Sequence, residues 1–117
     1  MDAASLERMR DKLHAQRLTL FRSAARVEED LRWLETDREP EPEERGQDEN
    51  MIRLLARLDD RQKAEIEDID RALRRIAMGT YGRCETCGRP IPMARLEALP
   101  TTPVCLECAA ARRESPT

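Results

Sequence analysis

Four cysteines carry the clearest chemical signal in this chain. They are Cys84, Cys87, Cys105 and Cys108, and their spacing is C-x2-C-x17-C-x2-C. Two such pairs are typical of a tetrahedral four-thiolate zinc site, because each Cys-x-x-Cys can be presented by one tight turn. Four protein ligands leave no coordination position open, so we expect one structural Zn2+ rather than a catalytic ion.

Redox chemistry and enzymatic catalysis are the weaker interpretations of these cysteines. A thioredoxin-like role for a Cys-x-x-Cys pair needs a strand-helix-strand context, which the surrounding pattern does not show. The chain has a single histidine, His14, and its four thiols are already assigned to metal. Because no nucleophile-base pair or open metal site can be assembled from these groups, we do not expect an enzyme.

The composition describes a small and highly charged protein. Its 117 residues suffice for one ordinary domain, but 38% are charged and only 3% aromatic, which disfavours a large aromatic pocket. A net charge of -3 argues against a protein that coats DNA. We find no run of about 20 apolar residues and no signal-peptide pattern, so we expect a cytoplasmic protein with no membrane contact and with reduced thiols.

The elements that must position the cysteines begin with two long helical patterns. In the first, apolar residues recur every seven positions, at Leu6, Leu13, Leu20, Val27 and Leu34. The second has the same three-and-four spacing, with Gln62 as a polar interruption, at Ile52, Leu55, Leu58, Ile66, Ile69, Leu73 and Ile76. Such narrow stripes predict two long helices that pack on each other. A basic strip on the first helix is usually a solvated face, although it could help to dock on an acidic partner surface, and it consists of Arg8, Arg10, Lys12 and Arg17.

A short acidic segment separates the two patterns. Residues 36–50 contain Pro40, Pro42 and Gly46 and no apolar residue, so we expect a turn or frayed tip there. The connection is short enough to favour an antiparallel hairpin, with Leu34 near Ile52 and Leu13 near Leu73. The fold class predicted is therefore all-α: a long antiparallel coiled-coil hairpin followed by a small zinc finger.

The second helical pattern ends at Gly79, which can close a helix in the left-handed conformation. From Thr80 onward the chain is rich in Gly, Pro and Cys, and short helices are expected near Met93–Leu99 and Pro103–Arg113. We therefore divide the chain into a coiled-coil hairpin at 1–79, with its acidic tip at about 36–50, and a C4 zinc finger with a C-terminal helix at 80–117.

Charge is segregated along this hairpin. Residues 35–49 hold eight acidic and two basic side chains, a local charge of -6, so the rest of the chain is mildly basic. A polar loop between helices is often no more than a solvated charge run. The alternative is functional, because acids at the end of a long hairpin can be delivered into a partner's positive or metal-containing cavity.

The segment YGRCETCGRPIPMARLEALPTTPVCLEC, residues 81–108, resembles the zinc-finger signature of the DksA/TraR family of bacterial transcription regulators. It shares the Tyr-Gly before the first cysteine and the Arg-Leu-Glu-Ala before a proline. The hairpin upstream is similar to that family's coiled coil in length and placement. This resemblance implies an interaction protein whose partner is RNA polymerase, with no direct DNA binding. We expect the protein to be a monomer.

In that family the coiled coil enters the secondary channel of RNA polymerase, and an acidic Asp-x-x-Asp-x-Ala motif at its tip acts near the active centre. The resemblance puts this motif on EPEERG, so that Glu41 and Glu44 stand for the two acids and Gly46 for the alanine. All three positions differ from the motif, and glycine weakens a helix start. Arg57 and Arg61 stand where the resemblance implies basic contacts with polymerase.

Family members bind guanosine tetraphosphate through basic side chains near the hairpin base and the finger. The resemblance puts Asp68, Leu99 and Ala109 at those positions, so phosphate groups would find little to pair with. We therefore expect this chain to act without the nucleotide.

Two other classes of function remain open from the sequence. The finger could bind nucleic acid directly, although between residues 83 and 117 five arginines are balanced by four glutamates, a weak electrostatic footprint. The hairpin could instead serve as a coiled-coil scaffold that dimerises through exposed seam residues. Salt-dependent DNA binding would favour the first class, and a concentration-dependent mass the second.

Overall fold

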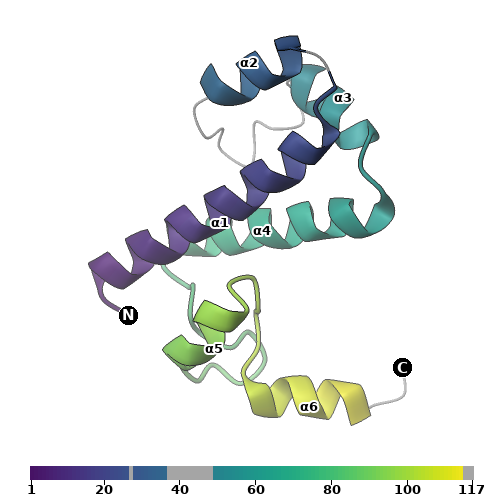
Figure 1. Ribbon diagram of the computed structural model, residues 1–117. Helices are drawn as coiled ribbons and strands as arrows, with labels where there is room; N and C mark the ends of the chain where they lie inside the picture. Colours follow the sequence, from purple (N-terminus) through teal and green to yellow (C-terminus); the bar gives the residue numbers. More distant parts are fainter. Residues whose placement is uncertain (27, 37–48, 115–117) are drawn as a thin grey trace.

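The computed structural model describes residues 1–26, 28–36 and 49–114, and it is all-helical there apart from one isolated bridge between Arg83 and Pro90 (Figure 1). The helices are α1 (Ala3–Ala24), α2 (Glu28–Thr36), α3 (Glu49–Ala56), α4 (Asp60–Met78), α5 (Met93–Ala98) and α6 (Leu106–Glu114). α1 and α4 form the predicted antiparallel pair, and the finger lies against one side of it. None of the described helices is both long and apolar enough to cross a membrane.

Local side-chain chemistry fixes the ends of the two long helices. The Asp2 carboxylate accepts a hydrogen bond from the Ser5 N–H at 2.8 Å and caps α1. Asp59 and Gln62 form a reciprocal capping box at the start of α4, with bonds of 2.8 and 3.0 Å. Gly79 ends α4 in the left-handed conformation, with φ of 77°, as the sequence predicts.

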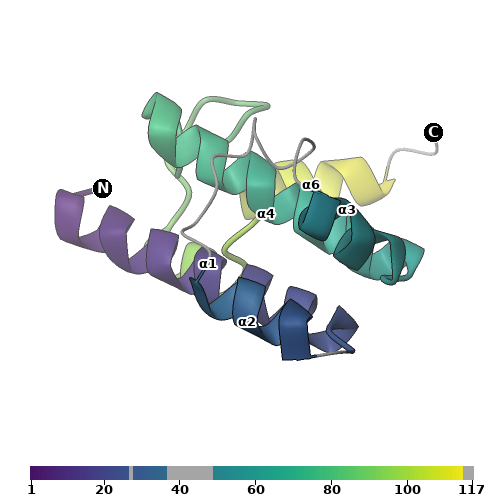
Figure 2. The same ribbon diagram turned by 90° about the horizontal axis from the view of Figure 1, so that it is seen from above.

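Each arm of the hairpin is divided into two helices, where the sequence pattern predicts one. α1 ends at Ala24 because Ala25 is extended, with ψ of 133°, and α2 then turns back over α1 (Figures 1 and 2). In the other arm, residues 57–59 separate α3 from α4. The prediction of two uninterrupted helices was therefore wrong. Gln62, interpreted as an interruption of the seam, instead helps to start a new helix.

Two hydrophobic cores result from this arrangement. The lower core joins the hairpin base to the finger and includes Leu13 and Leu73, the pair predicted to lie close together. The upper core gathers α1, α2, α3 and the start of α4, and its buried residues are Phe21, Ala24, Leu34, Met51, Leu54, Leu58 and Ile66. Ile52, predicted to pack near Leu34, is instead half exposed, because α3 turns Met51 and Leu54 inward.

A buried ion pair connects the two long helices. The Arg17 guanidinium of α1 donates to the Asp70 carboxylate of α4 at 3.0 Å, and their side chains are 9% and 1% exposed. Arg17 also lies 4.8 Å from the centre of the Phe21 ring and 3.7 Å from the Met51 sulfur. The expectation that Arg17 belongs to a solvated strip was wrong, because its charge is satisfied inside the hairpin.

Candidate metal centre

The four predicted ligands converge at one point of the finger. The Sγ atoms of Cys84, Cys87, Cys105 and Cys108 all lie within 4.8 Å of one another. The Cys87 and Cys105 sulfurs are 3.8 Å apart. A tetrahedron with Zn–S bonds of about 2.3 Å has S–S edges of about 3.8 Å, so the cluster has the dimensions of a zinc-thiolate site.

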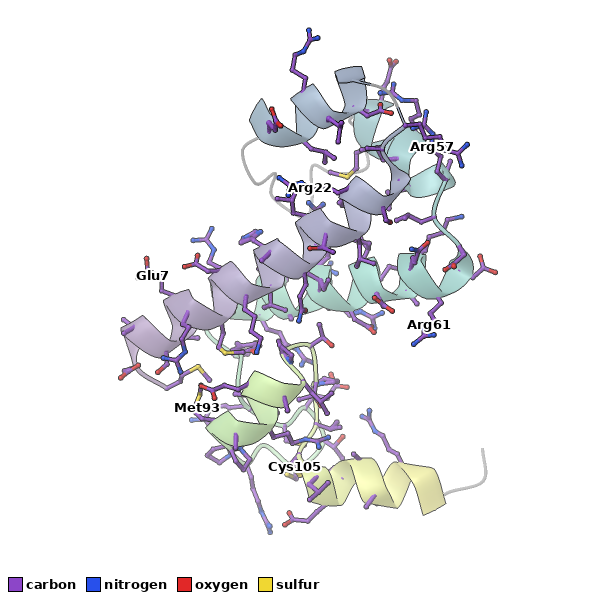
Figure 3. The ribbon with its side chains drawn as sticks, in the orientation of Figure 1. Glu7, Arg22, Arg57, Arg61, Met93 and Cys105 are labelled. Atoms are coloured by element: carbon purple, nitrogen blue, oxygen red, sulfur yellow. The ribbon has the colours of Figure 1, made fainter. Side chains whose placement is uncertain are left out.

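Backbone geometry presents the thiols in two turns. Gly88 has a φ of 76°, which lets its N–H donate back to the Cys84 carbonyl at 2.9 Å and close the first turn. The Cys87 N–H points at the Cys84 sulfur at 3.5 Å. The second pair lies at the start of α6, where the Ala109 N–H donates to the Cys105 carbonyl at 3.0 Å (Figure 3).

The thiols differ in acidity in a way that suits metal binding. Burial opposes ionisation of Cys84, but hydrogen bonds from the backbone of Cys105, Cys87 and Thr86 outweigh it and lower its pKa to about 5. Hydrogen bonding to the side chains of Cys105 and Cys84, together with burial, raises the pKa of Cys108. The clustered thiols therefore oppose full ionisation of one another, and a bound cation relieves this opposition.

The finger is held to the hairpin base by a shared core and by ion pairs. Tyr81 and Leu96 of the finger are buried in the lower core beside Met9 and Ile69 of the hairpin. Arg75 of α4 pairs with Glu85, and Arg8 of α1 pairs with Glu97 at 2.8 Å. The metal site is therefore coupled to the position of the hairpin.

Tyr81 is a finger residue whose role sequence reasoning did not assign. Its hydroxyl donates to the Pro100 carbonyl at 2.8 Å, and burial raises its pKa to about 12. The bond links the segment before the first turn to the segment that follows α5. The Tyr-Gly before Cys84 was the available sequence signal, but it did not indicate which carbonyl the hydroxyl would reach.

The other predicted site residues have varied surroundings. Arg61 extends from α4 into solvent and is 90% exposed (Figure 3). Arg57 is largely enclosed and donates to Asp30 at 2.7 Å and to the Ala24 carbonyl at 3.1 Å. Its guanidinium therefore has a structural role that the sequence did not indicate. Glu41, Glu44 and Gly46 lie outside the described residues.

A groove of about 460 Å³ opens between the hairpin and the finger. Asp68 and Leu99, two of the positions considered above for nucleotide contacts, both line it, together with Glu65 and Gln16. Among the described residues that line it, none is basic. Ala109, the third position, lies partly buried against the lower core.

Comparisons with known proteins give one consistent picture. The profile of the prokaryotic dksA/traR C4-type zinc finger matches residues 79–114. A Caulobacter vibrioides protein named "RNA polymerase-binding transcription factor DksA" is 37% identical over 107 residues, which are 92% of this chain and 75% of that protein. The Escherichia coli K12 protein of the same name is 36% identical over 69 residues, 59% of this chain and 46% of its own length.

Two solved structures also resemble this fold. Transcription factor DksA2 from Pseudomonas aeruginosa is 33% identical, with a TM-score of 0.64 over 97% of this chain and 87% of that one. DnaK suppressor protein from Agrobacterium tumefaciens C58 is 38% identical, with a TM-score of 0.54 over 92% of this chain and 90% of that one. The similarity thus extends over the hairpin as well as the finger.

Proposed function

The chain belongs to the DksA/TraR family of C4-type zinc-finger proteins, and on this premise we propose that it is a transcription regulator that binds RNA polymerase through the secondary channel. The observation that carries the proposal is the union of a helical hairpin and a four-thiol finger in one shared core. The finger fixes one end of the hairpin, and α2 and α3, which flank the acidic segment, lie across the α1·α4 pair from it (Figure 1). Two relatives by sequence, from Caulobacter vibrioides and Escherichia coli K12, are named RNA polymerase-binding transcription factors.

The finger's own contacts argue against the alternative of direct nucleic-acid binding. Arg95 donates to the Val104 carbonyl at 3.0 Å, and Arg112 donates to Glu85 at 3.3 Å and to Thr86 at 3.0 Å. Arg89 lies 3.9 Å from Glu107. Because Arg89 and Arg112 lie beside glutamates of the finger, little net positive charge remains there to attract phosphates.

The proposal includes independence from guanosine tetraphosphate. Support comes from the groove described above, where Glu65 and Asp68 contribute negative charge and Leu99 contributes an apolar wall. A polyphosphate approaching this surface would be repelled by carboxylates and would lack a bidentate guanidinium partner. The same groove would need basic side chains to hold such a ligand.

An in vitro transcription assay with the cognate polymerase tests this function. We expect the protein to bind core polymerase and to change initiation at a sensitive promoter by the same factor with and without guanosine tetraphosphate. Binding should weaken when another channel-binding protein occupies the secondary channel. Absence of binding would overturn the proposal, and a several-fold nucleotide effect would overturn only the part on independence.

The acidic tip yields a separate prediction. We expect the double substitution Glu41→Ala and Glu44→Ala to leave polymerase affinity within about twofold but to abolish the effect on transcription, because carboxylates near the active centre act on its metal ions and their ligands. Glu35→Ala with Glu49→Ala, at the margins of the acidic segment, is the matched control of equal charge loss. Unchanged transcription by the tip variant would make the segment a simple connector.

A further inference from the structure

The two arms of the hairpin are interrupted at the same level. α1 ends at Ala24, and the break between α3 and α4 begins at Arg57. The two interruptions touch, because Arg57 Nη1 donates to the Ala24 carbonyl at 3.1 Å. Both views show α2 returning alongside α1 rather than continuing its axis (Figures 1 and 2).

A buried carboxylate holds this folded-back arrangement. Asp30 of α2 has a fully buried side chain, and its Oδ1 accepts from Arg53 of α3 at 2.5 Å. Its Oδ2 accepts from Arg57 at 2.7 Å and from the Arg26 N–H at 3.2 Å. The two guanidinium groups hold the pKa of Asp30 well below its usual value, so the carboxylate stays charged near neutral pH.

The sequence is also compatible with a second arrangement. The residues at the breaks, 25–27 and 57–59, include neither proline nor glycine, so nothing in them forbids a continuous helix. The seven-residue repeat of apolar positions continues through the first break, from Leu20 to Leu34. Leu31, three residues before Leu34 of the first apolar pattern, and Ile52, the first residue of the second pattern, are 46% and 50% exposed in the folded-back form.

We propose that Asp30 is a positioning residue that latches the hairpin in a folded-back state, in equilibrium with an extended state in which α1 runs into α2 and α3 into α4. The extended state loses the Arg53 and Arg57 contacts with Asp30 and the packing of Leu34 in the upper core, and it gains a continuous apolar seam. It carries the end of α2 farther from the finger. A partner with a deep, narrow entrance stabilises the extended state, because only that state reaches inside. This last step rests on the proposed function.

Pulsed electron paramagnetic resonance can measure the two states in the free, zinc-loaded protein. Spin labels on noncanonical amino acids at the exposed positions Glu7 and Glu35 avoid the zinc-binding thiols. In a continuous helix these positions are about 42 Å apart, at about 1.5 Å per residue, whereas the folded-back state gives a much shorter distance. We expect the short distance in the wild-type protein and a large gain of the long distance in Asp30→Asn.

Matched variants distinguish the loss of the Asp30 contacts from a nonspecific loss of structure. Asp68→Asn removes one carboxylate from an exposed ion pair with Arg71 and should leave the short distance unchanged. Asp59→Ala removes a cap that is useful only when α4 begins at Asp60, so it should also raise the long-distance population. If Asp30→Asn loses its helical circular dichroism and is therefore unfolded, the distance distribution of Asp59→Ala alone tests the latch. A short distance retained in the folded variants would overturn the latch.

Adding core RNA polymerase to the labelled wild-type protein tests the partner step. We expect the long-distance population to become dominant at saturation. Binding with an unchanged short distance would overturn the inference while leaving the proposed function intact. Failure to bind would overturn the proposed function, whereas the effect of Asp30→Asn on the free protein would still support the latch.

Discussion

Replacement of Cys84 by serine should abolish zinc binding and unfold the finger together with the base of the hairpin. Serine keeps the size of the side chain but not the thiolate that a tetrahedral zinc site requires. Zinc binding in small fingers contributes about 10–16 kcal/mol of folding free energy, as much as the whole net stability of an ordinary domain. Because the buried Cys84 belongs to the core that also contains Met9 and Leu13, the loss should spread beyond the finger.

Native mass spectrometry and thermal unfolding by circular dichroism measure the two parts of this expectation. The variant should lack the mass of one zinc ion and should melt over a broad range at a much lower temperature. Ala110→Ser is the matched control, because it introduces the same side chain at an exposed position of α6, two residues after Cys108. Retention of zinc and of the wild-type melting curve by Cys84→Ser would contradict the assignment of a structural site.

The success of sequence analysis at the metal centre has a local cause. Each Cys-x-x-Cys pair forms its own turn. Because a structural zinc site needs four ligands, the two pairs must meet at one site. The spacing alone therefore predicted the cluster, and Gly79 predicted the end of α4. Both predictions rest on local sequence and do not depend on the packing of helices that are distant in the chain.

The breaks in the two arms depend on whether local capping and ion pairing are more favourable than a continuous helix, and apolar periodicity does not report on that difference. The apolar repeat records which residues can share a seam, but a capping box and a buried carboxylate compete with helix continuity. Asp59 and Gln62 have the spacing of such a box, so this signal was present and could have been interpreted. The role of Asp30 could not be predicted, because its partners Arg53 and Arg57 come from another arm.

The same limitation explains why Arg17 was expected on the surface. Along the sequence it is one more basic residue among several, and only the packing of α1 on α4 brings Asp70 to its guanidinium. An arginine on a charged helix is usually exposed, with its head group in water. Here its burial implies that the ion pair has a large effect on stability when one partner is removed.

We expect Arg17→Met to lower the free energy of unfolding by about 3–5 kcal/mol, because it removes the guanidinium that donates to the buried Asp70 carboxylate at 3.0 Å. The size of this effect follows from the 1% exposure of the Asp70 side chain, because water cannot take the place of the Arg17 guanidinium there. Arg8→Met makes the same substitution on the same helix in an ion pair with Glu97 that is more than half exposed, and should cost less than about 1 kcal/mol. Urea unfolding at saturating zinc measures both values.

The double variant Arg17→Met with Asp70→Leu decides what the pair contributes to the fold. If the penalty of the single variant comes from a buried carboxylate that has lost its guanidinium partner Arg17, removal of both charges should restore most of the lost stability, because apolar replacements for buried ion pairs are often neutral or better. A double variant as unstable as Arg17→Met would instead assign the loss to packing, including the contact of the guanidinium with Phe21. Recovery of stability would show that the ion pair adds no net stability, which favours a role in selecting the register of α1 against α4.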